Sequence, residues 1–205
     1  LTTTQMRSLS TTQIANVDAG QVASFTTTQL TQLNGTQLKS LSTSNLSALD
    51  TTQMAALTAT QIASLSTTQI AGLVAGDFGE VTATQVQSLV TSQLANLATD
   101  AVSALTTTQV AAMRTTQIQG LTTTQLGALD SSDIGEFTTT QLQSLTTAQV
   151  AGLTSTNAQS LSATQVAALT TTQVAALTVT NLSALDGTQV AALTTTQIGR
   201  LTNAV

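Results

Sequence analysis

Several residue types on which protein chemistry often depends are absent from this chain. It contains no cysteine, histidine, tryptophan, tyrosine or proline. Without cysteine there is no disulfide and no thiolate metal site. Histidine and cysteine are two of the commonest groups in general acid–base and nucleophilic catalysis. Without histidine, the many Ser and Thr hydroxyls lack the base that most often activates them. We therefore predict that the protein is not an enzyme, and we assign no catalytic and no cofactor-binding residue.

Charge is the second scarcity. Only 6% of the residues are charged, against roughly 25% in an ordinary globular domain. The net charge is −5, and the only cations are Arg7, Lys39, Arg114 and Arg200, which do not cluster. Nucleic-acid binding needs a basic patch, and no apolar run approaches the ~20 residues of a membrane span. We expect no nucleic-acid partner and no membrane span in this segment.

What the chain does contain is an eight-residue repeat. Every eighth residue from Leu1 to Leu201 is large and apolar, which divides the 205 residues into 25 octads and a five-residue remainder. Such a fixed period indicates a solenoid or array. We predict a single continuous array over residues 1–205. Because the chain starts in mid-pattern and ends inside a new octad, we expect it to be part of a longer protein.

One octad, residues 169–176 (L-T-T-T-Q-V-A-A), shows the pattern and what it predicts. Position 2 is a good helix N-cap, and position 5, which is Gln in 19 of the 25 octads, can complete a capping box with it. Positions 1 and 6 are then the two apolar residues of a hydrophobic staple. In the same frame, four acidic residues stand at position 2 as N-caps: Asp18, Asp50, Asp130 and Asp186.

The predicted fold is therefore all-α: a solenoid or superhelix of very short helices, one per octad, with positions 1 and 6 forming the apolar core. A single long helix does not fit, because an apolar stripe of period eight would spiral around it. Helices this short need their neighbours for stability. Ala158 is the one small residue at position 6, which predicts a local cavity. The alternative is a β-solenoid with two octads per coil, favoured by the abundant Thr and Val.

A longer period overlies the octads. The octads that begin at positions 17, 73 and 129 of the chain depart from the common pattern in similar ways and are spaced seven octads apart. Two causes are open. A block of seven octads was duplicated, or the superhelix has about seven octads per turn so that equivalent octads meet the same neighbours.

Two acidic pairs recur with this seven-octad spacing: Asp77 with Glu80, and Asp133 with Glu136. If seven octads made one turn, the four carboxylates could stack into an acidic patch. Oxygen ligands of this kind suit Ca²⁺, so these residues are candidate calcium ligands. The spacing matches neither an EF-hand loop nor a calcium β-roll repeat. The alternative is a solvated acidic spot without a metal and without any cofactor.

The octad pattern and the lack of cysteine resemble segments of very large secreted bacterial surface proteins of the adhesin type, which often carry long Thr-rich repeats. The resemblance implies an extracellular or cell-surface location and a structural role as a stalk, filament or matrix component.

Rows of Thr at positions 3 and 4 are expected on the outside, where a nearly uncharged surface favours self-association into a homo-oligomer or filament. The alternative is a binding module that uses the Thr rows for ice, carbohydrate or other surface glycans.

Overall fold

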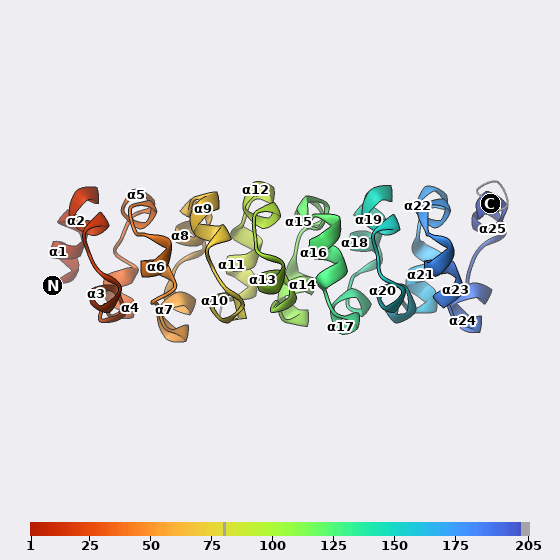
Figure 1. The fold of residues 1–205 in the computed structure, drawn as a ribbon, viewed down its shortest axis with the longest axis horizontal. Coiled ribbons are helices and arrows are strands. Elements are labelled where there is room, and N and C mark those ends of the chain that lie inside the picture. Colours follow the sequence, from red (N-terminus) through yellow and green to blue (C-terminus); the bar gives the residue numbers. More distant parts are fainter. Residues whose placement is uncertain (80, 202–205) are drawn as a thin grey trace. The chain divides into compact units, whose positions relative to one another are not determined.

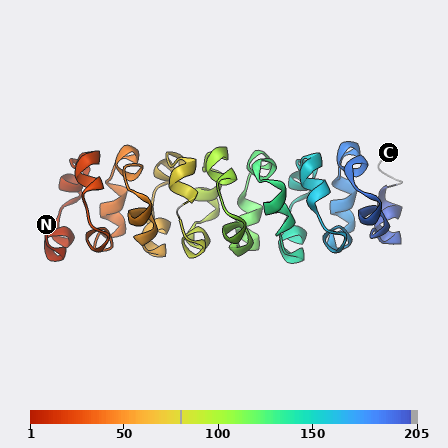
Figure 2. The same ribbon diagram turned by 90° about the horizontal axis from the view of Figure 1, so that it is seen from below.

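The computed structural model describes residues 1–79 and 81–201, and it divides the chain into two compact units, residues 1–105 and 106–205. The described residues of both units form short helices and no strand. The all-α prediction is therefore confirmed, and the alternative β-solenoid is wrong. In each unit the helices follow one another around a coil, with one helix to each octad (Figures 1 and 2).

The helices of the first unit are all short. They are α1 (Thr3–Ser8), α2 (Thr11–Ala15), α3 (Ala19–Ala23), α4 (Thr27–Leu30), α5 (Gly35–Lys39), α6 (Thr43–Leu46), α7 (Thr51–Ala56), α8 (Ala59–Ser64), α9 (Thr67–Ala71), α10 (Ala75–Gly79), α11 (Ala83–Ser88), α12 (Thr91–Ala95) and α13 (Thr99–Ser103).

The second unit also consists of short helices, one to each octad. Its helices are α14 (Thr107–Ala112), α15 (Thr115–Gly120), α16 (Thr123–Ala128), α17 (Ser131–Gly135), α18 (Thr139–Ser144), α19 (Thr147–Ala151), α20 (Ser155–Ser160), α21 (Ala163–Ala168), α22 (Thr171–Ala176), α23 (Val179–Ala184), α24 (Gly187–Ala191) and α25 (Thr195–Leu201).

Most helices begin as the sequence predicts. In α22, the Thr170 hydroxyl accepts a hydrogen bond from the backbone N–H of Gln173 at 3.2 Å, and the Gln173 Oε1 accepts one from the Thr170 N–H at 2.9 Å. The capping box therefore satisfies two of the amide groups that a helix start leaves unpaired. The four Asp residues predicted as N-caps all accept from the N–H of position 5, each at 2.8 Å: Asp18, Asp50, Asp130 and Asp186.

The coil within each unit has between three and four octads per turn. The helices in closest contact are three apart along the chain, such as α8 with α11 in the first unit and α22 with α25 in the second. Side-chain hydrogen bonds join residues 28 and 31 positions apart. Seven octads therefore correspond to about two turns inside a unit, and not to the single turn considered from the sequence.

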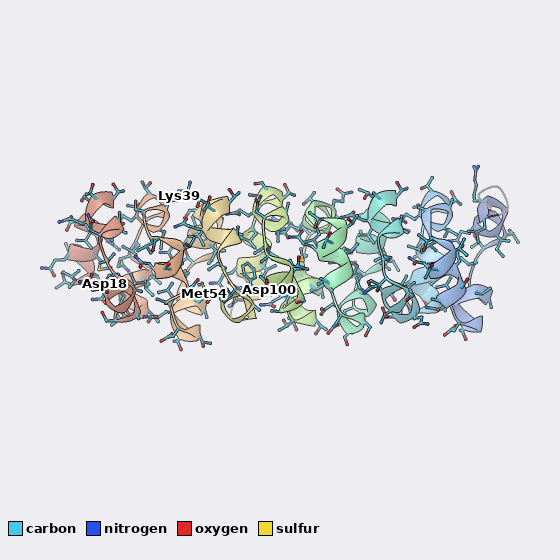
Figure 3. All side chains as sticks on the ribbon, viewed as in Figure 1. Asp18, Lys39, Met54 and Asp100 are labelled. Atoms are coloured by element: carbon cyan, nitrogen blue, oxygen red, sulfur yellow. The ribbon has the colours of Figure 1, made fainter. Side chains whose placement is uncertain are left out.

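The core of each unit is built from positions 1 and 6. At position 6, side chains such as Leu38, Val110 and Val174 are fully buried, and at position 1 the interior residues are almost as well covered. Met54, which is marked in Figure 3, belongs to this core. Ala158 is also fully buried; the cavity predicted there stays a prediction. The apolar seam expected from the sequence is therefore present.

Candidate functional site: the buried glutamines and the exposed threonines

The Gln at position 5 makes contacts that the sequence did not reveal. Besides closing the capping box, the Nε2 of Gln173 donates to the backbone carbonyls of Leu142 and Leu145, both at 2.8 Å. These two carbonyls belong to the preceding turn of the coil. The amide thus stabilises its own helix start through Oε1 and joins two turns through Nε2. We call this pair of roles the glutamine clamp.

The clamp recurs along both units. The carbonyl 28 residues earlier accepts a hydrogen bond from Gln61 at 2.7 Å, from Gln69 at 2.8 Å and from Gln149 at 2.8 Å. From Gln37 onwards, with Asp77 as an exception, the described side chains at position 5 are buried. A buried primary amide needs partners for both its oxygen and its nitrogen, and the clamp supplies them.

Asn replaces Gln at three places and keeps only part of the clamp. Asn45, Asn157 and Asn181 each donate through Nδ2 to the carbonyl 28 residues earlier, at 2.7, 3.1 and 3.0 Å. Within the described part of the chain, none of the three also reaches the second carbonyl of the preceding turn, whereas Gln173 bonds both. The shorter side chain accounts for the difference, because it lacks one methylene of reach.

Asp133 is the exception that is both buried and acidic. Its side chain is 2% exposed, and burial, followed by repulsion from Asp130, raises its pKa to about 6. Asp130 is the N-cap of the same helix, α17, and accepts from the Asp133 N–H at 2.8 Å. A carboxylate has no N–H to donate, so Asp133 cannot act as a clamp while it is ionised.

The structure describes three of the four candidate calcium ligands, Asp77 in the first unit and Asp133 and Glu136 in the second. Asp133 is buried while Glu136 is exposed. Asp77 accepts a hydrogen bond from the Val74 N–H at 3.0 Å, which is the helix-start role of position 5. Glu80 lies outside the described residues. Within residues 1–79 and 81–201, no three acidic side chains lie close enough to hold a metal ion.

The predicted outer hydroxyl rows are most complete at position 4. This position is exposed in all 25 octads and carries Thr or Ser in all but four of them, at Gly20, Gly76, Asp100 and Ala148. Charge interrupts the surface rarely, and three of the exposed charged residues, Asp18, Lys39 and Asp100, are marked in Figure 3. Position 4 is therefore exposed, small and nearly neutral in most octads.

Position 3 was expected to lie on the outside together with position 4, but it also takes part in packing between turns. A Cβ on Gly72 would lie 2.7 Å from the Thr43 methyl group, and one on Gly35 would lie 2.7 Å from the Ser64 Cβ. Both pairs join position 3 of one octad to position 8 of an octad in the turn that follows. Small residues at these two positions thus allow the turns to approach closely.

Comparison with known families supports the repeat character of the chain. The ALTTAQ repeat family model matches residues 107–139 and 126–163. The letters L-T-T-A-Q occur here at residues 145–149, which are positions 1 to 5 of an octad. No curated protein matches the chain. The chain therefore carries an octapeptide-type repeat, and the matched part is similar to the ALTTAQ repeat.

Proposed function

We propose that this chain is a non-enzymatic structural repeat protein of the bacterial cell surface or extracellular matrix, and that it builds a stalk or filament by self-association. The observation that carries this proposal is the set of exposed hydroxyls at position 4, which is exposed in every octad and is almost always Thr or Ser. A contact made by one of these hydroxyls can be made again at other octads, and weak identical contacts then add along the length.

The charge distribution favours the same function. A chain with four cations and nine acids among 205 residues has little charge repulsion to keep copies apart. Among the described helices, none is long and apolar enough to cross a membrane.

The cell-surface location rests on the resemblance to Thr-rich secreted repeat proteins, and labelling of intact cells with an antibody against this chain tests it. Labelling only after lysis would contradict that location.

Self-association has a direct test on purified protein. We expect electron microscopy of the concentrated protein to show fibres or bundles, and we expect a variant with Thr→Glu at Thr108, Thr116 and Thr124 to show fewer lateral contacts. The control carries the same three charges at exposed position 7, at Ala111, Ala151 and Ala167. A protein that stays dispersed at high concentration, without fibres, would leave this function without support.

The same exposed hydroxyls favour a second candidate, a module that binds ice or carbohydrate. Regularly spaced Thr hydroxyls and methyl groups could match an ordered array of water or sugar hydroxyls. A freezing-point depression below the melting point, or retention on a polysaccharide column, would favour this candidate. Loss of that signal in the Thr108, Thr116 and Thr124 variant, but not in its position 7 control, would assign the signal to the position 4 side chains.

A further inference from the structure

The two cations of the first unit lie together on its surface. Arg7 and Lys39 line one groove, with a volume of about 570 Å³, whose walls come from residues 7–11, 34–39 and 64 on three successive turns. Its lining contains no acidic residue. Both cations stand at position 7, which is exposed or half-buried in every octad of this unit. Their exposure is therefore a property of this position in the coil.

Acidic residues of the same unit line a different groove. Asp50 and Asp77 share a groove of about 270 Å³, and its lining contains no Lys or Arg. A Cβ added to Gly76, which also lines this groove, would meet nothing within 4 Å, so there is open space beside Asp77. We call Arg7 and Lys39 the cationic patch, and Asp50 and Asp77 the acidic patch.

The spacing along the chain places the two patches on different sides of the coil. Hydrogen bonds join successive turns at a separation of 28 residues, so residues about half that far apart lie across the coil from each other. Asp50 follows Lys39 by 11 residues, whereas Asp77 follows Asp50 by 27, which is close to a full turn. In Figure 1, α5, which carries Lys39, lies along one edge of the first unit, and α7 and α10 lie along the opposite edge.

The second unit, taken by itself, separates its charges in the same way. Asp130 follows Arg114 by 16 residues, and Asp186 follows Asp130 by 56, which is two turns of 28. In Figure 1, α15 and α25 lie along one edge of this unit, and α17 and α24 lie along the opposite edge. In each unit, cations and acids therefore stand on different sides of the coil.

We infer that the cationic patch of one copy of this chain docks on the acidic patch of a second copy, so that copies join side by side. Charge complementarity selects this partner, because the chain itself carries the patch of opposite sign that each groove lacks. The long side chains of Arg7 and Lys39 have the reach to enter the open space beside Asp77. The inference rests on the proposed function and deepens it, since it names the surfaces through which copies associate.

The position of the patches decides what kind of assembly forms. Because the two patches lie on different sides of the coil, they cannot both face the same partner. A pair of copies therefore leaves one cationic and one acidic patch open, and further copies can add.

Crosslinking tests the contact directly, because Lys39 is the only lysine of the chain. A carbodiimide joins an amine to a carboxylate that it touches. In a mixture of isotope-labelled and unlabelled chains, we expect crosslinks from Lys39 of one copy to Asp50 or Asp77 of another. The K39R control keeps the charge without the amine, so it should assemble normally and lose this crosslink. Crosslinks between copies from Lys39 only to other acids would overturn the inference.

Two variants of the full chain each remove one patch. R7Q/K39Q neutralises the cationic patch, and D50N/D77N neutralises the acidic patch. Asn keeps an oxygen for the N-cap bond, as Asn34 shows by accepting from the Gln37 N–H at 2.9 Å. Circular dichroism checks that both variants keep the helical content of the unaltered chain.

Sedimentation velocity over a range of concentrations gives the second readout. Each single-patch variant should associate about fivefold more weakly than the unaltered chain, since exposed ion pairs are individually weak. A mixture of the two variants should recover one-to-one dimers, because each supplies the patch that the other lacks. The matched control, A23E/A71E, adds two negative charges at exposed position 7, as R7Q/K39Q removes two positive ones, and should associate like the unaltered chain.

Salt gives a third readout. Raising the ionic strength from about 0.01 M to about 1 M shortens the screening length from about 30 Å to about 3 Å. Association of the unaltered chain should weaken over this range, and association of R7Q/K39Q should change much less. Equal salt dependence of the two proteins would contradict the inference.

Other outcomes separate this inference from the proposed function. If R7Q/K39Q assembles as well as the unaltered chain while the Thr108, Thr116 and Thr124 variant does not, the hydroxyls join the copies, and self-association survives without the charged contact. If the unaltered chain stays monomeric at every concentration, both fail. A monomeric chain that is retained on an acidic polysaccharide, with retention lost in R7Q/K39Q, would assign the cationic patch to a glycan and overturn the inference.

Discussion

Two octads of the second unit begin their helices with the same hydrogen bond to a position 2 cap, but they carry different side chains at the buried position 5. Residues 169–176 carry Gln173, whose amide bonds the carbonyls of Leu142 and Leu145. Residues 129–136 carry Asp133, which is equally buried and has a pKa raised to about 6. In both octads a side chain at position 2 accepts a hydrogen bond from the N–H of position 5.

This comparison distinguishes the residues that fold a single octad from those that join successive turns of the coil. The cap at position 2 and the apolar residues at positions 1 and 6 are enough to form α17 with a buried Asp at position 5. A buried Gln at position 5 adds stability, because its Nε2 donates hydrogen bonds to the buried carbonyls of the preceding turn. An acid in the same place is buried without that gain, and its ionised form is destabilised.

Replacing Gln173 with Leu should have the largest effect. The change removes one capping bond and two bonds to the preceding turn, and it leaves buried carbonyls without their donor. We expect the free energy of unfolding of the second unit to fall by about 3 kcal/mol, measured by urea denaturation. Thr164→Leu, at exposed position 4, is the control and should change it by less than about 0.5 kcal/mol. Equal effects would show that the clamp contributes little.

Replacing Asp133 with Gln, the common residue at position 5, should raise the free energy of unfolding of the second unit. Asp133→Gln removes a buried carboxylate, and we expect it to stabilise the second unit by about 2 kcal/mol at pH 7. The Asp186→Asn variant, changed at an exposed N-cap, controls for the loss of one charge. If Asp133→Gln proves neutral at pH 7, the burial of this carboxylate is not the destabilising feature of its octad.

The same residue makes stability depend on pH in a defined window. Because the pKa of Asp133 is raised in the folded state from 3.8 to about 6, the folded chain binds a proton more readily than the unfolded chain. This contribution to stability is fully present below about pH 3.8 and is lost as the pH rises through about 6. Urea denaturation from pH 4 to 7 should show the loss in the unaltered chain, and the Asp133→Asn variant should lack it.

Residues 153–160 allow a smaller test, because they carry Ala158 at position 6. Val fills this position in α21 and α22 within the same fold. We expect Ala158→Val to stabilise the second unit by about 1 kcal/mol through added apolar burial, measured by thermal and urea denaturation. Ala167→Val, at an exposed position, is the control. A loss of stability would mean that the neighbouring side chains have already closed around Ala158.

The smallest expected effect comes from lengthening one side chain. Asn157→Gln adds the methylene that would let the amide reach the Leu126 carbonyl as well as the Leu129 carbonyl that it bonds now. We expect a gain of about 0.5 kcal/mol in the free energy of unfolding. Asn96→Gln, at exposed position 8, serves as the control. No difference between the two would limit the clamp to the single bond that Asn already makes.

Much of the fold could be predicted from local chemistry. The capping boxes, the N-cap role of Asp18, Asp50, Asp130 and Asp186, and the apolar character of positions 1 and 6 all depend on residues within one octad. The calcium hypothesis stays a prediction, although in each unit the number of octads per turn differs from the seven on which it relied. The second role of Gln and the packing role of position 3 were missed, because both involve contacts between successive turns of the coil.

The sequence by itself determined where each helix starts, since a cap and its partner lie three residues apart and their hydrogen bonds form within one turn of backbone. It also determined which face of each helix is apolar. The tertiary structure alone decided how many octads make a turn, and with it which carbonyl each glutamine meets. The reason is that both depend on packing between successive turns, which small residues such as Gly35 and Gly72 allow to lie close together where they touch.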